Sequence, residues 1–179
     1  PTSTLASVEQ INGRIQLNHR LLKIDQAGAL VGGSRVELAG EMDLADWSQP
    51  KWFLDLNGQN VPILRTTKMI LRSDIDISVD ARNPEQSPLV AGGLDLRSST
   101  LLVDFDPLAP RLKKGSAARP PFFSINEEPF APWRFDLKAS GERFMRVRSP
   151  YFRARLSANM ALTGTFADPG LLGAVRTND

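Results

Sequence analysis

The most regular hydrophobic pattern in the chain lies in residues 151–166, where apolar and polar residues alternate. The odd positions are mostly polar and include Arg153 and Arg155. Successive side chains of a β-strand point to opposite faces, so this stretch predicts one long strand with one apolar and one polar, partly basic face. The even positions are Phe152, Ala154, Leu156, Ala158, Met160, Leu162, Gly164 and Phe166.

The same alternation recurs along most of the chain and predicts roughly nine or ten strands. Across Ser149-Pro150 the apolar positions change from odd to even, which predicts a bulge or a break there. Shorter alternating stretches cover residues 15–17, 22–25, 36–44, 52–56, 71–82, 94–96, 101–105, 134–139 and 145–148.

Turn and helix signals are few. The pairs Asn12-Gly13 and Asn57-Gly58 are typical of tight turns, and the second is the stronger hairpin signal. No segment has a 3.6-residue apolar period over a full helix, so we expect at most one or two helical turns, at 44–49 and 169–175.

The predicted fold class is therefore all-β. Each strand is apolar on one side only, and no helix is expected to cover those sides. A sandwich, a barrel or a strongly curved sheet folded over its own apolar face would each bury them.

A proline-rich segment divides the chain. Six of the 13 prolines fall in residues 107–132, and proline cannot donate to a strand ladder. We therefore expect β-sheet repeats in 1–106, an irregular connection in 107–132 and a continuation of the sheet in 133–179. The chain does not begin with Met and ends shortly after Asp168-Pro169-Gly170, so we expect one structural unit cut from a longer protein.

Composition excludes several classes of function. The net charge is only +2, whereas a nucleic-acid module concentrates far more Lys and Arg on one surface. The absence of cysteine excludes disulfides and thiolate chemistry, and with the single histidine it leaves no zinc-ligand set. No apolar run approaches the roughly 18 residues of a membrane span.

No catalytic residue, metal site or cofactor is predicted. His19 stands beside Arg20 near a strand end, as expected of a surface histidine. A glycan-active enzyme would need two carboxylates facing each other across a cleft, and nothing in the sequence pairs them. One acidic set has the spacing of a calcium loop, but Val79 stands where the loop needs glycine, and the alternation explains the set as the solvated face of a strand. This set is Asp74, Asp76, Ser78, Asp80 and Glu85.

One basic cluster stands out. Arg146, Arg148, Arg153 and Arg155 share a predicted face across the change of parity. Such a cluster is either a solubilising surface or a site for lipid phosphates or an acidic partner, because arginine matches phosphate geometry well. The apolar face likewise has two interpretations, a closed core or an open groove that takes acyl chains.

Three stretches in this order resemble the TamB family, the large AsmA-like proteins of the bacterial envelope. The resemblance to this family covers most of the chain except the proline-rich connection. The stretches are 36–44 (VELAGEMDL), 55–66 (DLNGQNVPILRT) running into 73–77 (SDIDI), and 153–169 (RARLSANMALTGTFADP).

The resemblance implies an elongated, sharply curved sheet, a β-taco or half-pipe with an apolar inner groove. It also implies a periplasmic location, with an anchor in the bacterial inner membrane outside this chain. The implied partners are phospholipid and an outer-membrane β-barrel of the TamA or BamA type, and the implied roles are phospholipid transport and outer-membrane assembly.

The resemblance also implies which residues line the groove, and the proline-rich segment 107–132 departs from it as an insertion, lid or lateral loop. The alternative is a closed sandwich or β-solenoid that binds protein through its sheet edges, and self-association of the chain is a further expectation. The implied groove residues are Leu38, Met42, Leu54, Leu56, Ile75, Ile77, Val79, Leu94, Leu96, Phe135, Leu137, Phe152, Leu156, Met160 and Leu162.

Overall fold

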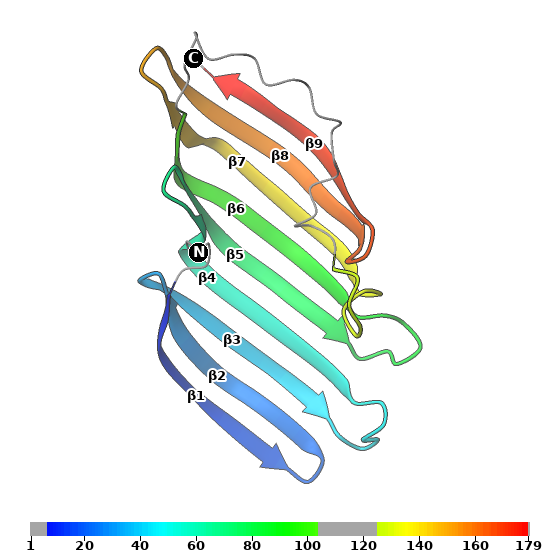
Figure 1. The fold of residues 1–179 in the computed structure, drawn as a ribbon. Helices are drawn as coiled ribbons and strands as arrows, with labels where there is room; N and C mark the ends of the chain where they lie inside the picture. The colour runs from blue at the N-terminus through cyan, green and yellow to red at the C-terminus, as the bar shows by residue number, and fades with distance from the viewer. Residues whose placement is uncertain (1–6, 104–124, 179) are drawn as a thin grey trace.

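The computed structural model describes residues 7–103 and 125–178, which form a single nine-stranded sheet (Figure 1). The strands lie in the sheet in the order of the chain, and every neighbouring pair is antiparallel except β6 and β7, which are parallel. The described residues contain no helix. The strands are β1 (Val8–Asn18), β2 (Leu21–Val31), β3 (Ser34–Asp43), β4 (Lys51–Arg65), β5 (Met69–Ala81), β6 (Leu89–Leu102), β7 (Arg134–Arg148), β8 (Arg153–Thr165) and β9 (Pro169–Asn178).

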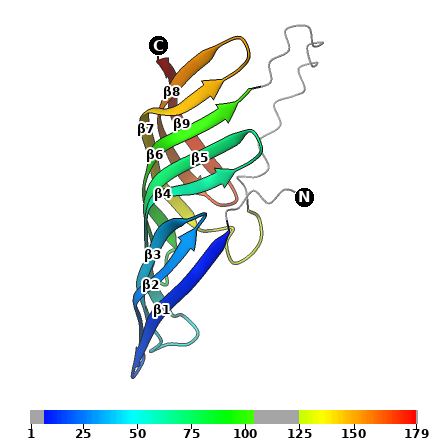
Figure 2. The same ribbon diagram turned by 90° about the vertical axis from the view of Figure 1, so that its left-hand side faces the viewer.

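The sheet is open and strongly curved. β1 and β9 are its two edges, and both ends of the strands bend toward the same side, which gives a half-pipe whose axis runs across the strands (Figure 2). The predicted all-β, curved half-pipe is therefore confirmed. A second sheet, which a sandwich would require, is not formed by the residues that the structure describes.

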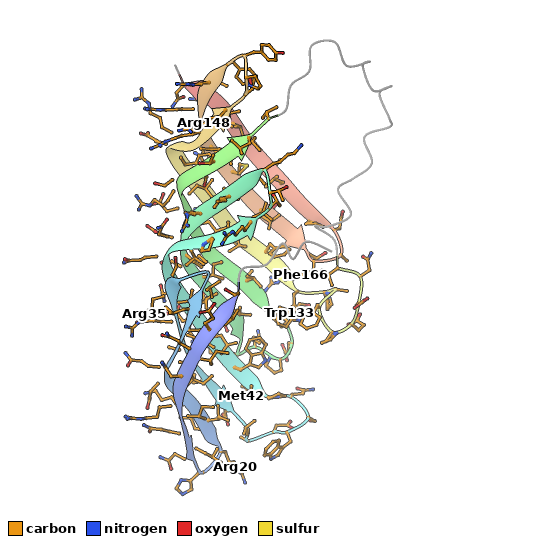
Figure 3. All side chains as sticks on the ribbon, turned by 60° about the vertical axis from the view of Figure 1, so that its left-hand side comes forward. Arg20, Arg35, Met42, Trp133, Arg148 and Phe166 are labelled. Atoms are coloured by element: carbon orange, nitrogen blue, oxygen red, sulfur yellow. The ribbon has the colours of Figure 1, made fainter. Side chains whose placement is uncertain are left out.

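The register brings the apolar positions of neighbouring strands into shared rows on one face. Leu38 pairs with Leu56, which pairs with Ile77, and farther along the sheet Leu137 pairs with Leu162. Directly paired residues project to the same face, so the local alternation of each strand adds up to one apolar face. Figure 3 shows this face on the concave side, with Trp133 and Phe166, whereas Arg35 and Arg148 project from the convex side.

The curvature comes with bulges in the strands. Register shifts interrupt the ladders, including those next to Gln10 in β1, Asn60 in β4 and Arg143 in β7. These three residues have φ angles of 52°, 51° and 48°, although none is glycine. A bulge bends its strand and increases the local twist, so the repeated bulges account for the half-pipe.

Side chains accept the hydrogen bonds that several bulges release from the ladder. The Asn60 N–H donates to Oδ1 of Asp74 at 2.8 Å. The Arg72 N–H, beside another register shift, donates to Oγ of Ser99 at 2.9 Å, and Ser99 is only 1% exposed. The Arg143 N–H donates to Oγ of Ser157 at 2.8 Å. The bends therefore leave these amides satisfied.

Both predicted Asn-Gly turns are wrong. Asn12-Gly13 lies inside β1, and Asn57-Gly58 lies inside β4. Their glycines serve close packing instead of a turn. A Cβ on Gly58 would stand 2.8 Å from Val61 and 3.2 Å from Val36, a gap that only glycine leaves open.

The two predicted helical turns are also wrong. Residues 169–175 belong to β9, where pairing with β8 overrides the local apolar run. Residues 44–49 form a short non-helical connection between β3 and β4.

The long strand predicted at 151–166 is observed as β8, and the predicted break at Ser149-Pro150 is the turn between β7 and β8. Of the proline-rich segment, 107–124 lies outside the described residues. Residues 125–132 form turns beside the start of β7, where the Ile125 N–H donates to the Phe166 carbonyl at 2.8 Å.

A small buried cluster lies on the concave side at the end of the sheet that carries the β7–β8 turn. Its members come from β6, β7 and β8, because the curvature brings their side chains together. This cluster is the part of the concave face that is packed like a core. It consists of Leu96, Phe144, Met145, Val147 and Ala158.

The bulge acceptors lead to a test of stability. We expect Ser99→Ala to lower the free energy of unfolding by about 1–3 kcal/mol, because it leaves the Arg72 N–H unsatisfied next to a buried site. Urea unfolding followed by circular dichroism measures the change. The control is Ser140→Ala on the convex face of β7, which we expect to change the stability by less than about 0.5 kcal/mol. Equal losses in both variants would contradict the role of the bulge.

Candidate functional site

The apolar residues predicted to line a groove are nearly all on strands and only partly covered. Thirteen of the fifteen are half-buried, Leu96 is buried and Phe152 is exposed. A closed core would bury most of them, whereas side chains on a face without a second layer stay accessible. The exposure therefore indicates an open apolar surface.

Phe152 is an exception to the prediction. It lies in the turn between β7 and β8 and not on a strand, and it is 45% exposed. The alternation of β8 includes its position, but the strand itself begins at Arg153. The structure therefore does not place Phe152 with the other apolar residues.

We call the central part of the concave face the concave stripe. It crosses β3 to β8, which at about 4.8 Å between neighbouring strands is a span of roughly 24 Å. Its side chains are aliphatic and half-buried, and they form rows through direct cross-strand pairs. It consists of Leu38, Leu54, Leu56, Ile75, Ile77, Val79, Leu94, Leu137 and Leu162.

An aromatic cluster, which we call the aromatic rim, borders the stripe along the end of the sheet where β4 and β7 begin. It contains Trp52, Phe130, Trp133, Phe135 and Phe166. The Trp133 ring lies 5.2 Å from Phe130 and 5.9 Å from Phe166, centroid to centroid, and Phe135 stacks on Phe166 at 4.2 Å. The rim thus joins three separate segments of the chain.

The contact between Trp52 and Trp133 spans the curved sheet. The two rings are 5.6 Å apart, yet Trp52 is at the start of β4 and Trp133 immediately precedes β7, with β5 and β6 between them. Three strand spacings are about 14 Å, and bending the strands does not shorten this distance, because the axis of the half-pipe runs across them. The rings meet because both large side chains reach toward each other across β5 and β6. The rim therefore links the start of β4 to the start of β7 at this end of the strands.

Sequence reasoning did not predict the aromatic rim. The alternation predicts Trp52 and Phe166 only as apolar strand positions, and Phe130 lies in the proline-rich segment that the sequence predicts to be irregular. The available signal was the spacing of Phe130, Trp133 and Phe135, three aromatic residues within six positions.

The buried cluster borders the stripe at the opposite end of the strands. Leu156 and Met160, two of the residues predicted for a groove, pack against it with Met69 and Leu71. They are therefore partly structural. The aliphatic surface that stays accessible lies between this cluster and the aromatic rim.

The convex face carries charges, and several of them form ion pairs. Arg97 contacts Asp74 at 2.8 Å and Asp95 at 2.7 Å, and Arg35 contacts Glu37 at 2.8 Å. These exposed pairs keep the face soluble and contribute little to stability.

The four predicted arginines form a separate group on the same face. Arg146 is directly opposite Arg155, and Arg148 is directly opposite Arg153. All four are exposed.

The titratable groups with shifted pKa values are explained by local hydrogen bonds at the surface. Hydrogen bonds from Arg82 lower the pKa of Asp80 to about 2, and a hydrogen bond from the Ser48 hydroxyl lowers the pKa of Asp46. His19 is exposed, and its Nδ1 lies 2.7 Å from Oδ1 of Asn18. None of these groups faces the concave stripe.

Within residues 7–103 and 125–178, no three His, Cys, Asp or Glu side chains converge as a metal-ligand group. The acidic residues of β5 have other contacts, since Asp74 binds Arg97 and the Asn60 amide. Helices capable of crossing a membrane are likewise absent from the described part of the chain. What the concave stripe offers chemically is non-directional contact with apolar groups.

Comparison with known proteins gives one match. A family model described as the TamB C-terminal domain matches residues 25–179, which extend from within β2 through β9. No curated protein and no solved structure matches the chain.

The aromatic rim leads to a second test of stability. We expect Trp133→Ala to lower the free energy of unfolding by about 2–4 kcal/mol, because it removes a half-buried ring together with its contacts to three other rings. Trp47→Ala is the matched control, because Trp47 is 79% exposed, and we expect a change below about 0.5 kcal/mol. Guanidinium unfolding of both variants measures the difference. A Trp133 variant as stable as the Trp47 variant would show that the rim does not stabilise the fold.

Proposed function

This chain belongs to the TamB family, and we propose that its concave stripe holds the acyl chains of phospholipids. The observation that carries the proposal is the set of half-buried aliphatic side chains that neighbouring strands place on the concave face of an open sheet. Apolar surface of this extent is costly to leave in water, and an acyl chain is the apolar ligand whose elongated shape fits a long, narrow stripe.

The binding would depend on area and not on specific polar contacts. Each methylene group removed from water contributes about 0.8 kcal/mol, so a chain of ordinary length gains enough from the stripe alone. The rows of Leu, Ile and Val present similar surfaces from β3 to β8, so no single position would fix a chain in place. Acyl chains would slide along the stripe, and the headgroups would stay in water beyond its borders.

The family sets the cellular role that we propose. TamB proteins are envelope proteins of transport and assembly, and we infer a periplasmic location for this chain. We further propose that it carries phospholipid between the inner and outer membranes and supports outer-membrane protein assembly. The proposed partner is an outer-membrane β-barrel of the TamA or BamA type, and the proposed anchor lies in the inner membrane outside this chain.

Strand addition at the sheet edges is a second candidate function. β1 and β9 each leave one edge unpaired within the described sheet, and both carry exposed apolar residues, such as Ile11 at 76% and Leu172 at 68%. Free edges of this kind pair with a strand of another protein or of a second copy. This candidate concerns the edges and is compatible with lipid in the concave stripe.

The lipid proposal is tested by a carboxylate in the stripe. We expect Leu162→Asp to reduce co-purifying phospholipid at least about tenfold, because the acyl chains would have to desolvate a charge. Mass spectrometry of an organic extract, normalised to protein, measures the lipid. Ile77→Asp, at another position of the stripe, should act in the same way.

The matched control is Ala161→Asp, which places the same charge on the convex face of β8, directly opposite Lys138. We expect this variant to retain the lipid content of the unmodified chain. Circular dichroism confirms that each variant is folded. A folded Leu162→Asp variant with undiminished lipid would refute the assignment of the stripe.

A further inference from the structure

The β7–β8 hairpin combines exposed aromatic residues in its turn with flanking arginines that have no ion-pair partner among the described residues. Tyr151 and Phe152 lie in this turn, and they are 66% and 45% exposed. Arg148 ends β7 and Arg153 begins β8, so the two strands hold an arginine on each side of the aromatic tip. In Figure 1 this hairpin projects at one end of the strands.

The arginines are arranged as two consecutive like-charged pairs. Arg148 faces Arg153, and the next pair on the same face is Arg146 with Arg155. Like charges directly opposite each other destabilise a sheet, so the arrangement has a cost in the free chain. Phosphate groups placed between the guanidinium groups would remove this repulsion.

The four arginines differ in their contacts from Arg35 and Arg97 on the same face. Arg35 and Arg97 each bind at least one carboxylate, whereas none of the four arginines has an ion pair or a side-chain hydrogen bond to any described residue. Their neighbours across the sheet are uncharged, with Thr100 opposite Arg146 and Asn178 opposite Arg155. The cluster is therefore a local excess of positive charge in a chain whose net charge is only +2.

An open hollow borders the two arginine pairs. A hollow of about 650 Å³ is lined by the four arginines, by Val147 and Ala154 between them, and by Thr177 and Asn178 of β9. Leu102 at the end of β6 lies opposite Arg148 and is 45% exposed, which adds an apolar neighbour to the basic group. Basic and apolar surfaces thus meet at the same end of the strands.

We propose that the β7–β8 tip docks on a membrane surface that contains anionic phospholipid. Tyr151 and Phe152 would enter the headgroup layer, where aromatic side chains are favoured, and the four arginines would bind lipid phosphates through their planar, forked donors. An acidic protein would satisfy the arginines but would not explain the exposed aromatic tip. The proposal concerns the convex face and does not require the concave stripe to bind lipid.

Flotation of the purified chain with vesicles tests the proposal. One set of vesicles contains phosphatidylcholine alone, and the other contains phosphatidylcholine mixed with phosphatidylglycerol. We expect binding to the anionic vesicles that weakens with salt. Each arginine near an anionic surface contributes about fivefold to partitioning, so Arg148→Gln with Arg153→Gln should lower it by roughly 25-fold.

Two controls separate this site from other causes of binding. Arg35→Gln with Arg97→Gln removes the same charge from the same face, and we expect it to leave partitioning within about twofold, because in the free chain both arginines already bind carboxylates. Trp47→Ala removes an exposed aromatic residue far from the tip in the chain and should also leave vesicle binding unchanged. Replacing Tyr151 and Phe152 by Ser should weaken binding to anionic vesicles.

Several results would overturn the proposal. They are equal binding to both kinds of vesicle, binding to neither, or equal losses in the two arginine double variants. Loss of vesicle binding in Trp47→Ala would assign membrane contact to another part of the surface instead. Because the lipid extraction above does not depend on the tip, failure of one proposal leaves the other testable.

Discussion

The half-pipe depends on bending its strands without leaving backbone amides unpaired. A bulge bends a strand by taking a residue out of the ladder, and an N–H released in this way is costly if it finds no acceptor. Asp74, Ser99 and Ser157 supply acceptors from neighbouring strands. Each of these side chains lies on the strand next to the bulge it serves, so curvature and pairing are maintained together. Without such acceptors the sheet would gain stability by flattening, and its apolar face would open to water.

Curvature in turn decides what the apolar face can be. On a flat single sheet these residues would be fully exposed, and in a sandwich they would be buried. In the half-pipe the aromatic rim and the buried cluster close the two ends of the strands, and the aliphatic residues between them stay half-covered. The intermediate exposure is thus a result of geometry, since one layer curved on itself covers its own concave side only in part. Only the residues at the borders of the stripe therefore contribute both to the proposed lipid site and to the stability of the fold.

Much of the fold could be predicted, because the alternation of apolar and polar residues indicates both where a strand lies and which of its residues share a face. The residues from Leu38 to Leu162 in the stripe were identified strand by strand, and direct pairing then brought them together. The bulges could not be predicted, because Gln10, Asn60 and Arg143 adopt positive φ without the glycine that normally marks it. The Asn-Gly pairs predict turns that do not form, because glycine has a different role there. Gly58 is needed for close contact with Val61 and Val36. The aromatic rim depends on contacts between distant segments, and alternation along a strand carries no information about such contacts.

The axis of the half-pipe runs across the strands, and this has a consequence for how such a structure changes in size. Each strand adds about 4.8 Å along the axis, whereas the positions of the bulges along the strands set the width of the concave face. The length and the width of the half-pipe are therefore determined separately. The number of strands sets the length, and the positions of the bends set the width. A duplicated or deleted hairpin would alter the length by a fixed step of roughly 10 Å and leave the cross-section as it was. A concave face built in this way could be lengthened in evolution without changes to the residues that line it.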